Sequence, residues 1–192
     1  MKKVYAGIDL SVTKIASFVM VDKDNNWSAG FWIPEKSLPR LNIFLRRKLV
    51  SFSKSGYLKI TSGDAVDYDV VLHDIIDFGK SNEIVDIAFD PWQSTVFSRM
   101  LTDAGFQVVE FSQTIRMFSE VSKKYIASRP VFLHPVLKWM DGNLKFSKDK
   151  VGNIKPNRKA GDISGIISGL MAMSRACAPT QRQADGGTVA EI

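Results

Sequence analysis

The sequence predicts an α/β fold whose sheet opens with three antiparallel strands and is completed by parallel strands. Three apolar or alternating segments lie at residues 3–9, 15–22 and 27–33. Further apolar segments then alternate with helical patterns, which is typical of β-α-β units with parallel strands. The 192 residues are 45% hydrophobic and 24% charged, so the chain fits one domain with a sizeable core.

The first three strands are predicted to form a meander. The polar "DKDNN" at 22–26 marks a hairpin turn between the second and third strands. The first strand ends on a carboxylate, Asp9, within "VYAGIDLS".

Two helices and a short extended piece are expected next. The first helix lies within residues 37–56 and ends at Gly56, residues 58–64 are extended, and the second helix spans 67–80. Apolar residues recur at helical spacing in both helices: Leu41, Phe44, Leu45 and Leu49, then Val70, Val71, Ile75, Ile76 and Phe78.

A β-α-β unit follows the second helix. "EIVDIAFDPW" at 83–92 is predicted as a strand ending on Asp90, residues 94–104 as a helix, and 106–111 as a parallel strand.

The remaining elements are helices and one hairpin. Helices are predicted at 114–128, 134–141 and 162–176. Between the last two, residues 143–159 have the alternation and central Gly152 of an exposed β-hairpin. Three antiparallel strands followed by α/β units is how a ribonuclease-H-like sheet is wound. Residues 1–177 are therefore assigned to one domain, and residues 178–192 to a flexible tail.

Composition excludes several classes of protein. A single cysteine, Cys177, excludes an internal disulfide framework, and there is no Cys/His cluster for a metal. No run approaches the roughly 18 apolar residues of a membrane span. The formal net charge of +6 permits a polyanionic partner such as nucleic acid. We expect an intracellular protein with no membrane association.

Three aspartates are the candidate catalytic residues. Asp9 and Asp90 each end a strand, and neighbouring parallel strands would bring both carboxylates to one edge of the sheet. Asp162 opens the last helix and shares a face with Gly165 and Gly169, whose small size would let that helix lie close to the sheet.

Each aspartate also has an ordinary explanation: a turn residue at Asp9, a helix cap at Asp90, and a partner for the helix dipole at Asp162. Together, however, three close carboxylates repel one another unless a cation neutralises them. Oxygen ligands without His or Cys suit Mg²⁺ or Mn²⁺. Two such ions about 3.5–4 Å apart can activate a water and stabilise the leaving oxygen of a phosphodiester.

The predicted hairpin is the candidate DNA-binding surface. Its cations, set against the single acid Asp149, are Lys145, Lys148, Lys150, Lys155, Arg158 and Lys159. A solvated lysine-rich loop would have the same composition. Beside a metal site, these side chains would neutralise DNA phosphates without reading bases.

Other polar and aromatic residues are interpreted as structural. His73 and His134 are expected to pack or cap, Asp64 and Asp67 to cap a helix, and Trp27, Trp32, Trp92 and Trp139 to occupy the core and its rim.

The ordered motifs resemble the nuclease domain of the large terminase subunit of tailed bacteriophages, over roughly residues 3–176. They are "GIDLS", "GYLKITSGDAVDYDVVLHDI", "IAFDPWQSTVFSRMLTDAGFQVVEFSQ", "HPVLKWMDGN", "DKVGNIKPNRK" and "GDISGIISGLMAMSRA". The resemblance implies a ribonuclease-H-like, metal-dependent endonuclease that cuts concatemeric viral DNA, with Asp9, Asp90 and Asp162 as ligands of two Mg²⁺ or Mn²⁺ ions.

The resemblance also implies partners and a location. These are double-stranded DNA, the protein's own packaging ATPase domain, the small terminase subunit and the portal, in the host cell cytoplasm. The phosphate-binding motif G-x-x-x-x-G-K-[ST] is not in the sequence, so the chain is interpreted as the nuclease domain without its ATPase domain. Two positions depart from the family pattern: the segment around His134 is shorter, and Gly161 replaces an apolar residue.

Three alternatives remain open at this point. A sugar-kinase or actin-like ATPase can also begin with "GID". That fold needs a second glycine-rich phosphate-binding loop, which the sequence does not contain. A junction resolvase or integrase shares the ribonuclease-H-like fold. A non-catalytic docking module would use the acids as caps and the hairpin to bind DNA or a protein.

Overall fold

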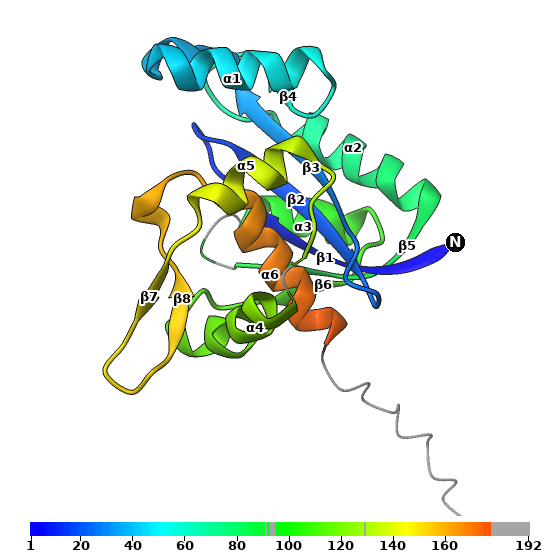
Figure 1. The fold of residues 1–192 in the computed structure, drawn as a ribbon. Coiled ribbons are helices and arrows are strands. Elements are labelled where there is room, and N and C mark those ends of the chain that lie inside the picture. The colour runs from blue at the N-terminus through cyan, green and yellow to red at the C-terminus, as the bar shows by residue number, and fades with distance from the viewer. Residues whose placement is uncertain (91, 93–94, 129, 178–192) are drawn as a thin grey trace, which may run out of the picture.

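The computed structural model of the chain describes residues 1–90, 92, 95–128 and 130–177 (Figure 1). The flexible tail predicted at 178–192 lies outside the described residues.

A six-stranded mixed sheet forms the centre of the molecule, in the order β4-β3-β2-β1-β5-β6. Its strands are β1 (Lys2–Asp9), β2 (Ala16–Asp22), β3 (Trp27–Pro34), β4 (Lys59–Thr61), β5 (Asn82–Phe89) and β6 (Val108–Glu110). The first three strands are antiparallel neighbours, and β5 and β6 run parallel to β1. The predicted meander and parallel unit are therefore confirmed. The short extended piece predicted after the first helix is β4, which pairs in parallel with β3.

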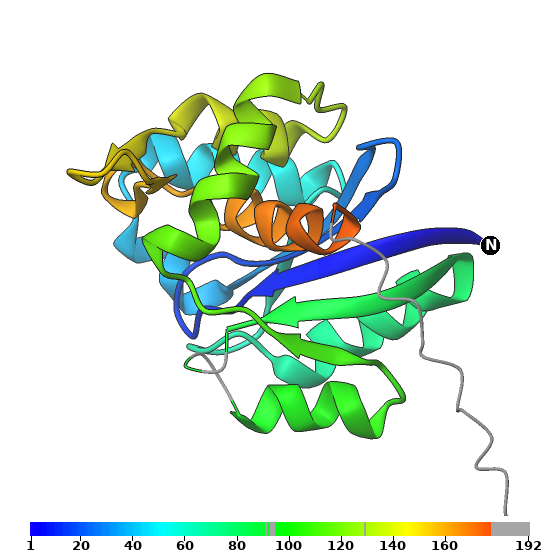
Figure 2. The ribbon, with the colours of Figure 1, turned by 90° about the horizontal axis from the view of Figure 1, so that it is seen from below.

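Helices cover both faces of the sheet (Figure 2). One face carries α1 (Ile43–Lys54), α4 (Ile115–Ser128), α5 (Pro135–Asn143) and α6 (Ser164–Ala176). The other face carries α2 (Tyr68–Ser81) and α3 (Thr95–Asp103). Short 3₁₀ turns lie at Glu35–Arg40 and Arg158–Ala160, and a separate two-stranded hairpin consists of β7 (Phe146–Lys148) and β8 (Ile154–Pro156).

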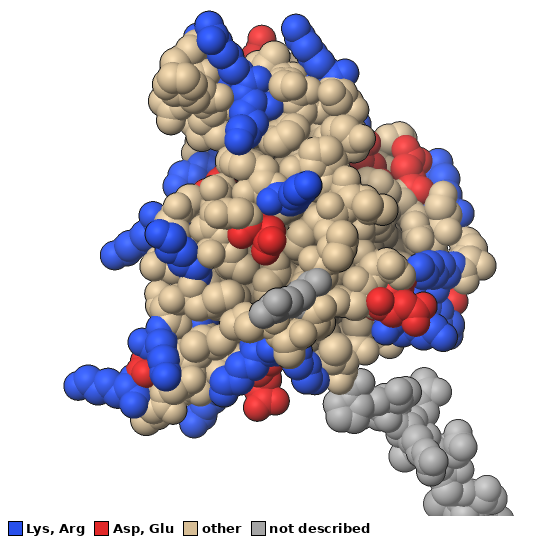
Figure 3. Space-filling view, viewed as in Figure 1, with Lys and Arg blue, Asp and Glu red and all other residues tan. Residues whose placement is uncertain are grey.

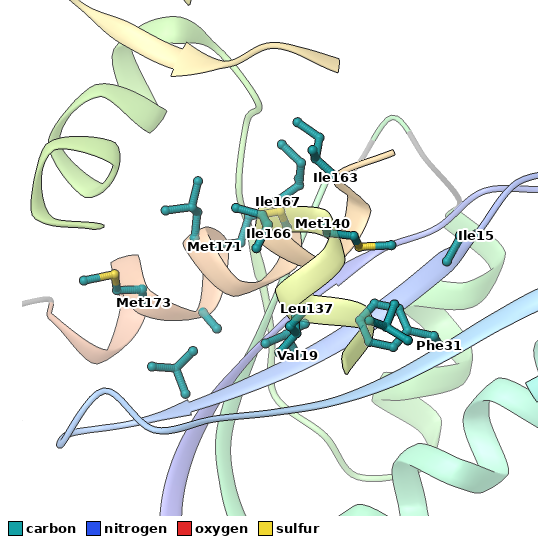
Figure 4. Packing of buried hydrophobic residues seen from close by; sticks show 14 of the residues in the cluster. Ile15, Val19, Phe31, Leu137, Met140, Ile163, Ile166, Ile167, Met171 and Met173 are labelled. Atoms are coloured by element: carbon teal, nitrogen blue, oxygen red, sulfur yellow. The ribbon is translucent and has the colours of Figure 1, made fainter. Parts of the chain in front are cut away.

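The alternation of side chains along the strands divides the core in two. In β2, Val19 and Val21 pack toward α6, whereas Phe18 and Met20 pack toward α2 and α3. Successive strand residues point to opposite faces, so a strand buried on both faces needs an apolar residue at nearly every position. Figure 4 shows the first cluster, in which residues of α5 and α6 meet residues of the sheet.

Small residues bring α6 against the sheet. A Cβ added to Gly7 in β1 would lie 2.1 Å from the backbone oxygen of Ser168, and one added to Gly169 would lie 1.7 Å from the ring of Trp27. Within the same contact, the hydroxyls of Ser17 and Ser168 form a buried hydrogen bond of 2.7 Å. The prediction that Gly165 and Gly169 allow a close approach is confirmed.

The sequence interpretation is wrong at three apolar residues, one of which is Ile76, expected on the apolar face of the second helix but exposed in α2. Phe44 was expected on the apolar face of the first helix, but its side chain is 80% exposed. The reason is local: Asn42 caps α1 by accepting a hydrogen bond from the Leu45 amide at 2.9 Å, and this start directs Leu45 and Leu49 inward instead. Trp92, expected in the core or its rim, is 92% exposed.

A search of the described helices for a membrane-spanning segment found no candidate of sufficient length and hydropathy.

Candidate nuclease site at the carboxyl edge of the sheet

Asp9 and Asp90 follow neighbouring parallel strands. Ile8 of β1 is paired with Phe89 of β5, so the next residue of each strand is one of these aspartates. Both are buried, at 3% and 8% exposure. The predicted placement of the two residues at one edge of the sheet therefore follows from the observed register.

Asp9 is the last residue of the β1 ladder, where it lies opposite Ser17 of β2. Asp90 begins the connection after β5, and its carboxylate accepts a hydrogen bond from the Trp92 amide at 3.2 Å. This contact is a local turn, one of the ordinary roles considered for a strand-end aspartate. It uses one carboxylate oxygen.

Asp162 is positioned by the turn that leads into α6. Gly161 has φ 155°, which few L-residues adopt, and a Cβ there would lie 3.1 Å from the side chain of Asn143. Asn143 donates to the Asp162 carbonyl at 3.1 Å, and the Asp162 carboxylate accepts from the amide and hydroxyl of Ser164 at 3.1 and 3.0 Å. The Asp162 carboxylate thus accepts a hydrogen bond from a backbone amide that has no partner within the helix, and it faces the edge of the sheet.

A cavity of about 440 Å³ opens at this edge. The polar side chains that line it are Asp9, Ser11, Lys14, Gln113, Arg158, Asp162 and Ser164. The structure therefore brings Asp9 and Asp162 into one pocket, the acidic pocket. Within the described part of the chain, Asp90 is not among the lining residues.

Arg158 forms a bidentate ion pair with Asp9. Its Nη1 and Nη2 donate to the two carboxylate oxygens at 2.9 Å each, and Nη2 also donates to Oε1 of Gln113 at 2.7 Å. The Gln113 amide completes the triangle with a long contact of 3.4 Å to Asp9. The Arg158 side chain remains 48% exposed, whereas that of Asp9 is 5% exposed.

In the acidic pocket, negatively charged carboxylates lie close together. Burial and, to a lesser degree, the charge of Asp9 raise the pKa of Asp162, against the hydrogen bonds from Ser164 and the charge of Arg158. Burial lowers the pKa of Arg158, but hydrogen bonds to Asp9 and the charges of Asp9, Asp162 and Asp90 raise it above its ordinary value. Asp90 is therefore close enough to act on the same guanidinium.

The oxygen donors suit a hard cation such as Mg²⁺ or Mn²⁺, because carboxylates line the acidic pocket and no His or Cys is among its described lining residues. As the side chains are placed, however, no group of three or more His, Cys, Asp or Glu among the described residues could hold a metal ion. Asp9 instead binds the guanidinium of Arg158 with both oxygens.

The basic hairpin lies beside this pocket. Its two strands are shorter than the predicted segment 143–159, because residues 149–153 form a turn around Asp149. That carboxylate accepts from the side chain and amide of Asn153, which lowers its pKa. Gly152 in this turn has φ 89°.

The predicted DNA-binding lysines are available for a ligand. No carboxylate of a described residue pairs with any of them: Lys145, Lys148, Lys150, Lys155 and Lys159. A second cavity of about 390 Å³, the basic groove, is lined by Lys155, Lys159, Arg158, Gln113 and their neighbours. Among the predicted DNA contacts, Arg158 alone forms an ion pair with a carboxylate of a described residue.

Gln113 and Lys14 are pocket residues that the sequence interpretation missed. Gln113 lies three residues after β6, the third parallel strand, whereas Asp9 ends β1 and Asp90 directly follows β5. Its position after a strand end was therefore an available signal. Lys14 lies in the β1–β2 turn and carried no such signal.

Asp67 and His134, two of the residues interpreted as structural, have structural surroundings, whereas His73 is exposed and neither packs nor caps within the described part of the chain. Asp67 caps α2 by accepting from the amides of Asp69 and Val70 at 3.0 and 3.2 Å. His134 packs between the rings of Phe31 and Tyr57, each at 5.2 Å between centroids. His73 is exposed and pairs with Asp77.

Comparisons with known proteins identify the family of the chain. A family model described as "Terminase large subunit, endonuclease domain" matches residues 1–179. The large terminase subunit of Enterobacteria phage HK97 is 28% identical over 188 residues, which cover 90% of this chain and 36% of that protein. Protein YmfN of Escherichia coli K12 is 28% identical over 163 residues, covering 76% of this chain and 35% of its own length.

Solved structures show the same fold. The crystal structure of the HK97 large terminase superposes with a TM-score of 0.80 at 27% identity, covering 91% of this chain and 40% of that one. The large terminase nuclease of thermophilic phage G20c superposes with a TM-score of 0.53 at 8% identity, covering 92% and 80%, and so supports the fold alone.

The chain spans about 35–40% of the length of the first three of these relatives. Its sheet has the ribonuclease-H-like combination of three antiparallel strands followed by parallel strands that the sequence predicted, and the family match extends over every described residue. This chain therefore belongs to the family of endonuclease domains of the terminase large subunit.

Proposed function

We propose that the chain is a metal-dependent endonuclease that cuts concatemeric double-stranded viral DNA during genome packaging, with little sequence specificity. The observation that carries this proposal is the meeting of Asp9 and Asp162 in one acidic pocket, beside Asp90, in a member of the terminase endonuclease family. Other members of the ribonuclease-H-like superfamily remain the alternative, since resolvases and integrases would use the same type of site.

Asp9, Asp90 and Asp162 would hold two Mg²⁺ or Mn²⁺ ions. When bound, the ions would supply a nucleophilic water and neutralise charge on the leaving oxygen. The chain itself contributes rigidity: Asp9 is fixed by the β1–β2 ladder, and Asp162 by Asn143 and Ser164. Carboxylates held in this way need little reorganisation when they bind.

The hairpin would bind the DNA backbone. Lys155 and Lys159 line the basic groove, which shares Arg158 and Gln113 with the acidic pocket. Figure 3 shows Lys and Arg side chains gathered over this hairpin at the lower left of the molecule. Phosphate contacts of this kind give affinity and orientation but no sequence discrimination.

The wider context is also a proposal, because the chain spans a minor part of its full-length relatives. In a complete terminase this domain would act together with a packaging ATPase domain, the small terminase subunit and the portal, in the cytoplasm of the host cell.

A plasmid-nicking assay with Mn²⁺ tests the catalytic assignment. Asp9→Asn and Asp162→Asn keep the side-chain volume and remove a ligand charge, so we expect cutting to fall at least about 100-fold. Asp86→Asn is the matched control: Asp86 is an equally buried aspartate of β5 that pairs with Arg175 instead of lining the acidic pocket. Unchanged cutting by Asp9→Asn would contradict the proposal.

One observation favours a second candidate, a non-catalytic DNA-docking module. Asp9 is already neutralised by Arg158, and the described residues hold no ready metal site. Calorimetry distinguishes the two functions: a docking module would bind duplex DNA but give no heat with Mg²⁺ or Mn²⁺. A nuclease would bind both.

A further inference from the structure

Arg158 and Gln113 lie between a cavity that contains carboxylates and a cavity that contains lysines. Both residues line the acidic pocket with Asp9 and Asp162, and both line the basic groove with Lys155 and Lys159. Arg158 is thus the side chain that borders the carboxylates on one side and the proposed DNA-binding surface on the other.

The backbone of Arg158 is held in a short turn between the hairpin and α6. Asn157 accepts from the Lys159 amide at 3.0 Å at the start of this turn, and the Asn157 amide donates to the Lys145 carbonyl at 2.7 Å. The long side chain then crosses to Asp9, with 48% of its surface still exposed. An anchored backbone with an exposed side chain allows the guanidinium to change partners without refolding.

The present partners of the guanidinium are those that a metal ion would need. Arg158 donates to both oxygens of Asp9, one of the three proposed metal ligands. Asp162 and Asp90 also attract it. A divalent cation in this pocket would compete for Asp9 and repel the guanidinium.

We propose that Arg158 is a metal-displaced switch: without metal it neutralises Asp9, and on metal loading it turns to the basic groove and binds a DNA phosphate. A guanidinium fits both partners because its fork of N–H donors matches carboxylate and phosphate alike. Metal binding and DNA binding are then coupled through one side chain. This inference rests on the proposed metal-dependent function.

Metal affinity without DNA tests the first half of the switch. Mn²⁺ is titrated by calorimetry into residues 1–192 as wild type, Arg158→Gln, Arg158→Lys and Lys159→Gln. Loss of the competing guanidinium should tighten Mn²⁺ binding at least about tenfold in Arg158→Gln, and less in Arg158→Lys, which keeps the charge but loses the fork. Lys159→Gln is the matched control, since it removes the same charge from the adjacent exposed residue and should change the affinity less than about threefold.

DNA affinity with and without a metal tests the second half. Fluorescence anisotropy of a labelled duplex is measured in EDTA and in Ca²⁺, a hard cation that takes oxygen ligands. In the wild type, Ca²⁺ should increase the DNA-binding constant. In Arg158→Gln, the increase in the logarithm of that constant should be at most half as large. Lys159→Gln should weaken binding by the same factor in both conditions, because its contact is present throughout.

The outcomes separate this inference from the function on which it rests. If the wild type binds Mn²⁺ and cuts DNA, but Arg158→Gln matches Lys159→Gln in Mn²⁺ affinity, the switch is wrong and the nuclease proposal stands. Weaker Mn²⁺ binding by Arg158→Gln would also overturn the switch, since Arg158 would then be positioning Asp9 for the metal. If no protein, wild type included, binds Mn²⁺, both proposals fail.

Discussion

At the scale of single residues, the guanidinium of Arg158 offsets the repulsion between the carboxylates of the acidic pocket. Sequence pattern could predict Asp9 and Asp90, because each ends a strand, and parallel neighbours share an edge. It could not predict that Arg158 binds Asp9, since 149 residues separate them and only the path of the hairpin brings them together. A local sequence pattern can locate acidic residues at the ends of strands and helices. Which cations pair with these residues depends on the tertiary structure.

His134 gives a prediction for stability against pH. Burial lowers its pKa to about 4, and its Nδ1 has no hydrogen-bond partner among the described residues. Between pH 4 and the unfolded value near 6.5, the unfolded chain binds a proton that the folded protein does not, so the free energy of unfolding rises with pH. The slope from this residue is at most about 1.4 kcal/mol per pH unit.

Urea unfolding at several pH values between 4.5 and 7.5 measures that slope. In His134→Phe, which keeps an aromatic ring against Phe31 and Tyr57, stability should fall less steeply as the pH is lowered. Identical slopes for the wild type and His134→Phe would contradict the assignment.

At the scale of elements, the position of α6 determines where Asp162 lies. Periodicity predicted this helix and its glycine face, because both are properties of one segment. The facing Gly7 of β1 was not predicted, since the level at which a helix crosses a strand depends on both partners. The hairpin is similar: its composition was evident, but its two strands of three residues each are limited by the turn around Asp149.

Gly169→Ala tests the close contact of α6 with the sheet. Alanine favours a helix by up to about 1 kcal/mol over glycine, but its Cβ would lie 1.7 Å from the ring of Trp27. The clash should dominate and lower the free energy of unfolding by about 1–3 kcal/mol. Chemical denaturation measures the change.

The matched control is Gly142→Ala in α5, where an added Cβ meets no described atom within 4 Å. Helix propensity alone should then make this variant as stable as the wild type or more stable, by up to about 1 kcal/mol. If Gly169→Ala were also stabilising, the close contact would not be a constraint on the position of Asp162.

At the scale of the whole molecule, the charge is distributed unevenly around the sheet. The hairpin lysines, which pair with no carboxylate of a described residue, lie beside the edge that carries Asp9, whereas Lys3 pairs with Glu83 and Lys80 with Asp77 at the opposite end of β1 and α2. The net charge of +6 indicated a polyanionic partner, but the sequence alone could not show which cations are left without a carboxylate. Arg46, Arg47 and Lys54 of α1 line a further cavity and also pair with no carboxylate of a described residue. The hairpin face is therefore favoured for DNA by its position beside the acidic pocket and not by its charge alone.

The salt dependence of DNA binding tests that preference for one face. Each phosphate contact contributes about −0.9 to the slope of the logarithm of the binding constant against the logarithm of salt concentration. The double variant Lys155→Gln/Lys159→Gln should therefore reduce the magnitude of the slope by up to about 2, measured by anisotropy with a duplex in EDTA. Lys3→Gln/Lys80→Gln removes the same charge from the opposite end and should leave the slope near that of the wild type. Equal reductions in both double variants would mean that DNA responds to net charge alone, and the hairpin would lose its assignment as the binding surface.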